Sequence, residues 1–496
     1  MGILQRQGIT NAIITYVGIV IGFISLLVIQ PRFLSTEEIG LTRVLFSFSA
    51  LIATFMPFGM NSITLKYFPY FRNKDKGHYG FFMFMLLLPV GGFLVIGMLL
   101  WLIKGFIIAQ YVTQAALFTE YFYYIFPLTF FLSLISVLNA YSYSLFKTSF
   151  PGFLSEVIVR LLSIALFTLY FIKQIDRDAF VLLFTAIYGL QLIVLLVYIF
   201  IIDNPSLKVD RAFLKEQKPV QMIKYGLLLS FVALTSLGLK YLDVVMLGKF
   251  VPLSLVGIYS ICAFIPAVIE APLGALEKIG LAKISDAWSK NNLTEIKEIY
   301  FKSSMYLFLA GGLLFLLINL NLDSLFLLIP KQEFSIGKYV VLIISIGTLL
   351  NMATGVNDSV IYTSHKYIFG TYLLIFLFPL AFVNNLIFIP LYGINGAAFA
   401  TALSAFLYNA IKYLFIWKNF KLQPFNIQTF YIIITIILTF LIVQFIPHFT
   451  TPFVDIIIRS IIISIVYITL AFILRIVPEL FSMIPFFGKG QSSKKW

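Results

Sequence analysis

The sequence consists of one long apolar stretch after another, separated by short polar connections. A helix that crosses the roughly 30 Å hydrocarbon core of a bilayer needs about 20 mostly apolar residues. About fourteen stretches meet this requirement, so the chain is predicted to be an all-α polytopic membrane protein with about 14 transmembrane helices. The predicted spans are residues 8–30, 41–66, 80–103, 120–145, 151–172, 179–202, 222–247, 255–276, 302–321, 339–361, 367–389, 396–417, 428–446 and 453–474.

The composition excludes a soluble fold. Of the 496 residues, 60% are hydrophobic and 11% are charged, and the mean hydropathy is +0.99. Soluble domains carry roughly 25% charged residues, and none has enough interior to hide so much apolar side chain. The single cysteine, Cys262, excludes a disulfide framework, and the three histidines lie far apart in the sequence. We therefore expect no metal and no cofactor, and because no P-loop motif occurs, ATP is not expected to drive the protein directly.

The net charge of +14 is explained by topology rather than by nucleic acid. Lys and Arg concentrate in the connections after the second, sixth and eighth predicted spans and near the C-terminus, which places both termini in the cytoplasm. These basic connections are expected to meet anionic lipid headgroups. The first apolar run is too long for a signal peptide and is taken as the first span. The two longest polar segments are residues 203–221 and 277–301, and the second is expected to form a short amphipathic helix at the interface.

The two halves of the chain resemble each other in sequence. A shift of 217 residues places Phe33 on Phe250, Gly40 on Gly257 and Lys66 on Lys283. A shift of 219 places Tyr143 on Tyr362, Lys147 on Lys366 and Phe150 on Phe369. Since about six spans separate the copies, both copies have the same orientation, and the repeat is parallel.

The repeat divides the chain into four parts. Residues 1–202 and 222–417 are predicted to form two six-helix lobes, residues 203–221 a cytoplasmic linker, and residues 418–496 two extra helices and a basic cytoplasmic tail. Parallel repeats occur in secondary transporters, which handle substrate between the halves near the membrane midplane. The sequence therefore indicates a transporter and not an enzyme.

Three segments carry a resemblance to a known family. They are FLSTEEIGLTRVLFSF after the first span, YLDVVMLGKFVPLSLVGIYS at the seventh and eighth, and NLIFIPLYGINGAAFATALS at residues 385–404. With them the chain resembles the polysaccharide biosynthesis flippases of the multidrug/oligosaccharidyl-lipid/polysaccharide exporter (MOP) superfamily. The resemblance implies two six-helix lobes around a central cavity that opens alternately to each side. It also implies a lipid-linked (undecaprenyl-diphosphate) oligosaccharide as cargo, carried across the bacterial inner membrane for surface polysaccharide synthesis, with glycan-assembly enzymes as candidate partners.

Ionisable side chains at membrane depth are candidate functional residues, because they cost free energy unless they are paired or hydrated. Arg43 and Lys66 on the second span are candidates for binding a diphosphate, since both can face the cavity; each can also simply reach out to an interface. Lys240 and Asp243 lie three residues apart on the seventh span and either form a structural ion pair or face the cavity. Glu270 lies between two prolines and could donate a hydrogen bond to a carbonyl that they free only if it is protonated.

The resemblance also implies a coupling site. Cation-coupled exporters of the superfamily carry acids on the seventh and tenth spans, and Asp243 and Asp358 match those spans. They are the candidates for a Na⁺ or H⁺ site. Glu156 with Arg160, and Asp455 with Arg459, have the i, i+4 spacing of intrahelical ion pairs and are predicted to be structural.

Two other functions fit parts of the sequence. A cation-coupled multidrug or organic-cation antiporter would need cavity acids with few compensating cations, whereas Arg43, Lys66 and Lys240 favour an anionic cargo. A membrane-embedded glycosyltransferase or polymerase would need a sizeable external loop with acid/base residues, and the predicted external loops are short. The lipid-linked oligosaccharide flippase therefore accounts for more of the sequence than either alternative.

Overall fold

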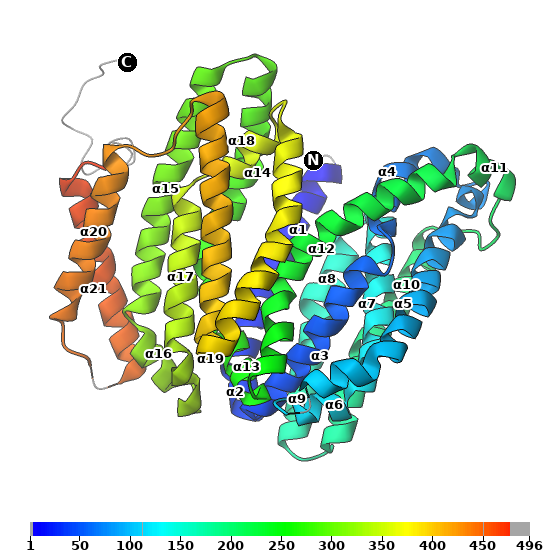
Figure 1. The fold of residues 1–496 in the computed structure, drawn as a ribbon, viewed down its shortest axis with the longest axis horizontal. Coiled ribbons are helices and arrows are strands. Elements are labelled where there is room, and N and C mark those ends of the chain that lie inside the picture. Colours follow the sequence, from blue (N-terminus) through cyan, green and yellow to red (C-terminus); the bar gives the residue numbers. More distant parts are fainter. Residues whose placement is uncertain (1–2, 112, 450, 477–496) are drawn as a thin grey trace. The chain divides into compact units, whose positions relative to one another are not determined.

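The computed structural model describes residues 3–111, 113–449 and 451–476, and it is helical throughout, with no strand in those ranges (Figure 1). The basic C-terminal lysines lie outside them. The α-helices are α1 (Ile3–Ile24), α2 (Gln30–Phe33), α3 (Thr36–Phe55), α4 (Met60–Phe71), α5 (Phe81–Tyr111), α6 (Ala116–Glu120), α7 (Ile125–Ser144), α8 (Ser149–Phe153), α9 (Val159–Phe171), α10 (Arg177–Ile202), α11 (Arg211–Glu216), α12 (Pro219–Phe250), α13 (Leu253–Cys262), α14 (Ala267–Ser289), α15 (Leu293–Asn319), α16 (Leu322–Leu328), α17 (Lys338–Ala353), α18 (Asn357–Tyr362), α19 (Tyr367–Phe420), α20 (Ile427–Gln444) and α21 (Pro452–Ile473). Short π-helical turns at Ser25–Ile29 and Leu154–Ile158 lie within the first and fifth spans.

The prediction of a polytopic all-α membrane protein is confirmed. In the described residues, twelve helices are long and apolar enough to cross a membrane, or thirteen if the bent pair α13 and α14 forms one span. The 54-residue α19 counts once among these, although Gly393, with φ 57° and ψ −130°, interrupts its helical backbone. At about 1.5 Å per residue each part of α19 is long enough for a span, which reconciles this count with about fourteen.

Contacts divide the chain into two compact units. The first unit comprises residues 1–261 and 374–397, and the second comprises residues 262–373 and 398–496. Each unit contains segments that are distant in sequence. Residues 374–397 of α19 belong to the first unit, and the rest of α19 belongs to the second.

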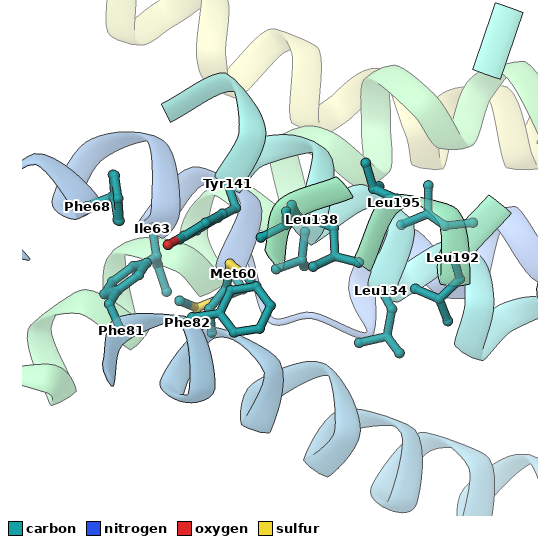
Figure 2. Packing of buried hydrophobic residues seen from close by; sticks show 14 of the residues in the cluster. Met60, Ile63, Phe68, Phe81, Phe82, Leu134, Leu138, Tyr141, Leu192 and Leu195 are labelled. Atoms are coloured by element: carbon teal, nitrogen blue, oxygen red, sulfur yellow. The ribbon is translucent and has the colours of Figure 1, made fainter. Parts of the chain in front are cut away.

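The first unit has an aromatic-rich core between α4, α5, α7 and α10 (Figure 2). Tyr141 of α7 is fully buried there, with its ring centroid 5.0 Å from that of Phe68 and 5.2 Å from that of Phe82. Such close ring pairs stabilise beyond the area they bury, by about 0.5–1.5 kcal/mol each. The hydroxyl of Tyr141 donates to Asp203 at the end of α10, so the polar tip of the ring is satisfied.

In the second unit, α15 packs against α14, α17 and α20, and α20 runs alongside α21 (Figure 1). The polar segment 277–301 does not form a separate interfacial helix, so that prediction is wrong. Its residues continue α14 to Ser289 and start α15 at Leu293, where Asn292 caps the new helix by accepting from the backbone N–H of Glu295. The polar residues of this segment form the last turns of α14 and the first turns of α15, beyond the apolar part of each helix.

The 217-residue repeat is visible at one contact inside the first unit. A Cβ atom on Gly40 of α3 would lie 1.9 Å from the carbonyl oxygen of Leu253, and one on Gly257 of α13 would lie 2.0 Å from that of Thr36. Leu253 is Thr36 shifted by 217, and Gly257 is Gly40 shifted by the same number. The two helices therefore touch through equivalent residues, as across a two-fold axis.

Candidate functional site

Arg43 lies about two turns into α3, a helix that Ser35 and Glu38 start with a reciprocal capping box. The guanidinium Nη2 donates to Oε1 of Gln30 at 3.1 Å. The phenol groups of Tyr188 on α10 and Tyr241 on α12 interact with it electrostatically. Among the described residues, no carboxylate lies within ion-pair distance of Arg43, so its charge has only neutral partners.

Lys66 and Lys240 are both exposed and lie against tyrosine rings of the first unit. The ammonium of Lys66 is 3.8 Å from the ring centroid of Tyr225 on α12, and that of Lys240 is 5.9 Å from the ring centroid of Tyr241. Cation–π contacts at exposed sites contribute roughly 0.5–1 kcal/mol. These contacts hold the two ammonium groups only loosely.

Asp243 on α12 is held by side chains from two other helices. Tyr259 of α13 donates to its Oδ2 at 2.7 Å, and Asn385 of α19 donates to its Oδ1 at 2.8 Å. Asn385 is fully buried, and its own Oδ1 finds no hydrogen-bond partner among the described residues. Both carboxylate oxygens of Asp243 therefore accept a hydrogen bond from a neutral side chain.

Asp358 on α18 has a partner that the sequence did not reveal. Lys412, 2% exposed on α19, places its ammonium 3.1 Å from Oδ2 of Asp358 and 4.2 Å from the ring centroid of Tyr408. The other carboxylate oxygen, Oδ1, is buried and has no hydrogen-bond partner in the described part of the chain. Asp358 is thus half of a charge pair rather than an isolated acid.

The structure brings Glu270 and Asp358 into one neighbourhood of the second unit. Asn351 of α17 donates to Oε1 of Glu270 at 3.1 Å. Glu277, about two turns further along α14, interacts electrostatically with both Asp358 and Glu270. Glu270 therefore accepts from an amide, where the sequence had suggested donation to a carbonyl freed by proline.

The two predicted structural ion pairs have different outcomes. Arg160 and Glu156 do form their i, i+4 pair, with 2.5 Å between Nη2 and Oε2, and Arg160 also donates to the carbonyl of Gly18 on α1. The pair predicted for Asp455 and Arg459 does not form in the described structure. Asp455 instead accepts from Ser324, His448 and the backbone of Phe449, because the connection before α21 folds back over it.

The candidate residues therefore lie in two groups, one in each unit. The first unit holds Arg43, Lys66, Lys240 and Asp243, and the second holds Glu270 and Asp358. Sequence inspection missed Asn385 and Lys412, although an amide and an ammonium group inside apolar runs were signals that could have identified both. No cluster of three His, Cys, Asp or Glu side chains that could hold a metal ion occurs among the residues that the structure describes.

Comparison with known proteins shows what the fold is. No protein-family model matches the sequence, and no curated protein does. Among solved structures, the chain is similar to the lipid II flippase MurJ in an inward closed conformation, with a TM-score of 0.73, 13% sequence identity, and coverage of 94% of this chain and 98% of MurJ.

Two transporters of the MOP superfamily are also similar to the chain. An inward-facing multidrug resistance MATE transporter has a TM-score of 0.61 and 13% identity, over 80% of this chain and 94% of the transporter. A transporter from Pyrococcus furiosus, described as having a binding pocket of reverse polarity, has a TM-score of 0.53 and 12% identity, over 83% and 95%. The chain therefore has the fold of the MOP-superfamily transporters, as its resemblance to that superfamily predicts.

Proposed function

We propose that the protein is a flippase that moves a lipid-linked oligosaccharide, carried on undecaprenyl diphosphate, across the bacterial inner membrane by alternating access. Both termini would lie in the cytoplasm, as the distribution of Lys and Arg favours. The similarity to MurJ, a lipid II flippase, over nearly the whole of both chains supports a lipid-linked cargo.

The observation that carries the proposal is the environment of Arg43. A guanidinium in a membrane helix costs several kcal/mol unless a partner compensates its charge, and its partners here are Gln30 and two tyrosines. A diphosphate would supply the missing negative charge, and the planar guanidinium can donate two hydrogen bonds to it. An organic cation would instead be repelled, which disfavours the multidrug antiporter.

Coupling to Na⁺ or H⁺ is proposed at two places. At Asp243, both carboxylate oxygens accept hydrogen bonds from neutral groups, the Tyr259 hydroxyl and the Asn385 amide, and a coupling cation would bind to the carboxylate beside them. Asp358 already has the ammonium of Lys412 as its counter-ion. A coupling cation at Asp358 would therefore have to displace Lys412, whereas one at Asp243 would add to existing ligands.

The experiment that tests the cargo is deletion of the gene, followed by an inventory of lipid-linked saccharides and surface glycan. The flippase predicts that lipid-linked repeat units accumulate with their sugars facing the cytoplasm and that surface glycan is lost. Normal surface glycan with altered drug tolerance would point to the antiporter. Loss of the repeat units themselves, with only their precursors present, would point to an enzyme.

The site is tested by variants at Arg43 and Asp243 in the deletion strain. Arg43→Ala and Asp243→Asn should each abolish restoration of surface glycan while the protein remains folded in the membrane. Arg43→Lys should retain part of the activity, because it keeps the charge and loses the two-pronged geometry. Arg32→Ala, at an exposed arginine on α2, is the matched control and should restore glycan fully. Full activity of both Arg43→Ala and Asp243→Asn would refute the assignment.

A further inference from the structure

A pocket in the second unit is lined by none of the cargo or coupling candidates. It has a volume of about 600 Å³ and is lined by residues of α15, α16, α17, α20 and α21 together with the connection after α20. Because α20 ends at Gln444 and the lining continues through Phe445 and His448, the pocket lies where these helices leave the apolar part of the membrane. Tyr339 and Phe445, which line it, are 62% and 89% exposed, as expected of aromatic side chains at the level of lipid headgroups.

One end of this pocket is polar and incompletely satisfied. Arg459 of α21 is 4% exposed, and its guanidinium donates to the carbonyls of Ile446 and Leu320, but its Nε finds no hydrogen-bond partner in the described structure. Asn319 at the end of α15 donates to the carbonyl of Phe315, while its Oδ1 likewise has no partner among the described residues. Buried polar groups normally find partners, so this end of the pocket holds one donor and one acceptor whose hydrogen bonds are not formed in the described residues.

The charges around the pocket balance. Lys338 and Asp323 face each other at its rim, with 2.6 Å between Nζ and Oδ1. Arg459 at its base has the carboxylate of Asp455 four residues earlier on α21, without an ion pair between them, so the nearby formal charges cancel; Asp455 is 1% exposed and bonded to His448. A free phosphate would find no net positive field here, and a hydrocarbon chain alone would leave the polar groups without partners.

The opposite wall is apolar and continues toward the membrane. Leu342 of α17 and Phe440 of α20 line the pocket, and Phe440 is 39% exposed. A ligand in this pocket would therefore have a polar head that carries both charges and a hydrocarbon tail that lies along α17 and α20.

We propose that this pocket binds a zwitterionic glycerophospholipid, a phosphatidylethanolamine of the surrounding bilayer. Its phosphate lies toward Arg459 and Lys338, its ammonium toward Asp323 and Asn319, and its acyl chains follow Leu342 and Phe440. The lipid would tie the two C-terminal helices α20 and α21 to α15 and α17. This site does not depend on the proposed cargo or on the coupling residues.

The test is native mass spectrometry of the full-length protein in mild detergent, titrated with phosphatidylethanolamine or phosphatidylglycerol of identical acyl chains. Wild type should bind phosphatidylethanolamine at a lower lipid concentration than it binds phosphatidylglycerol. Asp323→Asn removes the ammonium partner and leaves the site net positive, so the preference should shift toward phosphatidylglycerol by about tenfold. Lys338→Gln should weaken the binding of both lipids. Lys297→Gln, at an exposed lysine elsewhere in the unit, is the control and should change nothing.

Soluble O-phosphoethanolamine separates a lipid site from a site for a free headgroup. It should fail to displace the lipid, because the apolar wall contributes to binding. Displacement by O-phosphoethanolamine, or equal retention of both lipids by wild type and all variants, would overturn the proposal. Asp323 and Lys338 are partly exposed side chains, so their variants should fold, which thermal unfolding of each would verify.

Discussion

Lys412 is a charged side chain that the fold encloses almost completely. Its ammonium lies 3.1 Å from Asp358 and against the ring of Tyr408. Removing one partner of a buried pair leaves the other uncompensated, which costs about 3–5 kcal/mol in fully buried cases. The Asp358 side chain is 35% exposed, so the cost here should be lower, at about 2 kcal/mol.

We therefore expect Lys412→Gln to lower the thermal unfolding temperature of the purified protein, and Lys412→Gln combined with Asp358→Asn to recover most of the loss. A double-mutant cycle measured by thermal unfolding isolates the coupling between the two side chains. Additive effects of the two substitutions would show that the pair does not stabilise the fold.

Asp203 gives a pH-dependent prediction outside the membrane spans. Burial alone would raise its pKa, but hydrogen bonds from His78 and Tyr141 and the charge of Lys74 hold the pKa of this carboxyl below its ordinary value. A depressed folded-state pKa stabilises the protein above the unfolded-state value of about 3.9, and this stabilisation is lost as the pH falls below that value.

Thermal unfolding of wild type should accordingly move to lower temperature between about pH 5 and pH 3. The unfolding temperature of Asp203→Asn should be lower than that of wild type at neutral pH and should change less with pH. Asp210→Asn, at the exposed N-cap of α11, is the control for a general effect of removing a carboxylate. Identical pH slopes in wild type and Asp203→Asn would contradict the assignment.

At the scale of elements, Gly393 interrupts the helical backbone of α19 and divides it into two parts. Its φ of 57° and ψ of −130° belong to a region that residues with a side chain rarely enter, and a Cβ there would meet only Val251 at 3.8 Å. The cost of Gly393→Ala is therefore conformational, about 1–3 kcal/mol, with little steric contribution.

Gly393→Ala should reduce the amount of folded protein in the membrane and its unfolding temperature. Gly91→Ala in α5 is the same substitution at a helical position where a Cβ meets nothing within 4 Å, and it should be neutral or stabilising. Quantitative immunoblotting and thermal unfolding compare the two. A stable Gly393→Ala protein would mean that the turn tolerates another backbone conformation.

The sequence predicted the spans well because their signal is local: each needs only about 20 apolar residues in a row. It also placed a break within α19, since residues 390–395, which include Gly393, fall between two predicted spans. It failed for the segment 277–301, because polar residues at the ends of two long helices look the same as an interfacial helix. The sequence could mark Asn385 and Lys412 as polar residues in apolar runs, but it could not pair them with Asp243 and Asp358, which lie 142 and 54 residues earlier in the chain.

At the scale of the whole molecule, the repeat predicts that the same substitution at two equivalent positions has the same effect. Gly40 and Gly257 occupy equivalent positions and each faces the backbone of the other's helix. A methyl group at either position would lie within 2.0 Å of a carbonyl oxygen, so α3 and α13 would have to separate. Overpacking of this kind costs about 1–3 kcal/mol, which is roughly a five- to 150-fold change in the population of the closed contact.

Gly40→Ala and Gly257→Ala should therefore have the same effect. The measurement is crosslinking by a short bifunctional thiol reagent between cysteines placed at Thr36 and Leu253, in a background where Cys262 is replaced by Ser. Both alanine variants should lose most of the crosslink that the parent forms, while Gly105→Ala, where a Cβ meets nothing within 4 Å, should keep it. If only one variant lost the crosslink, the two contacts would not be equivalent, and the two-fold relation between α3 and α13 would fail.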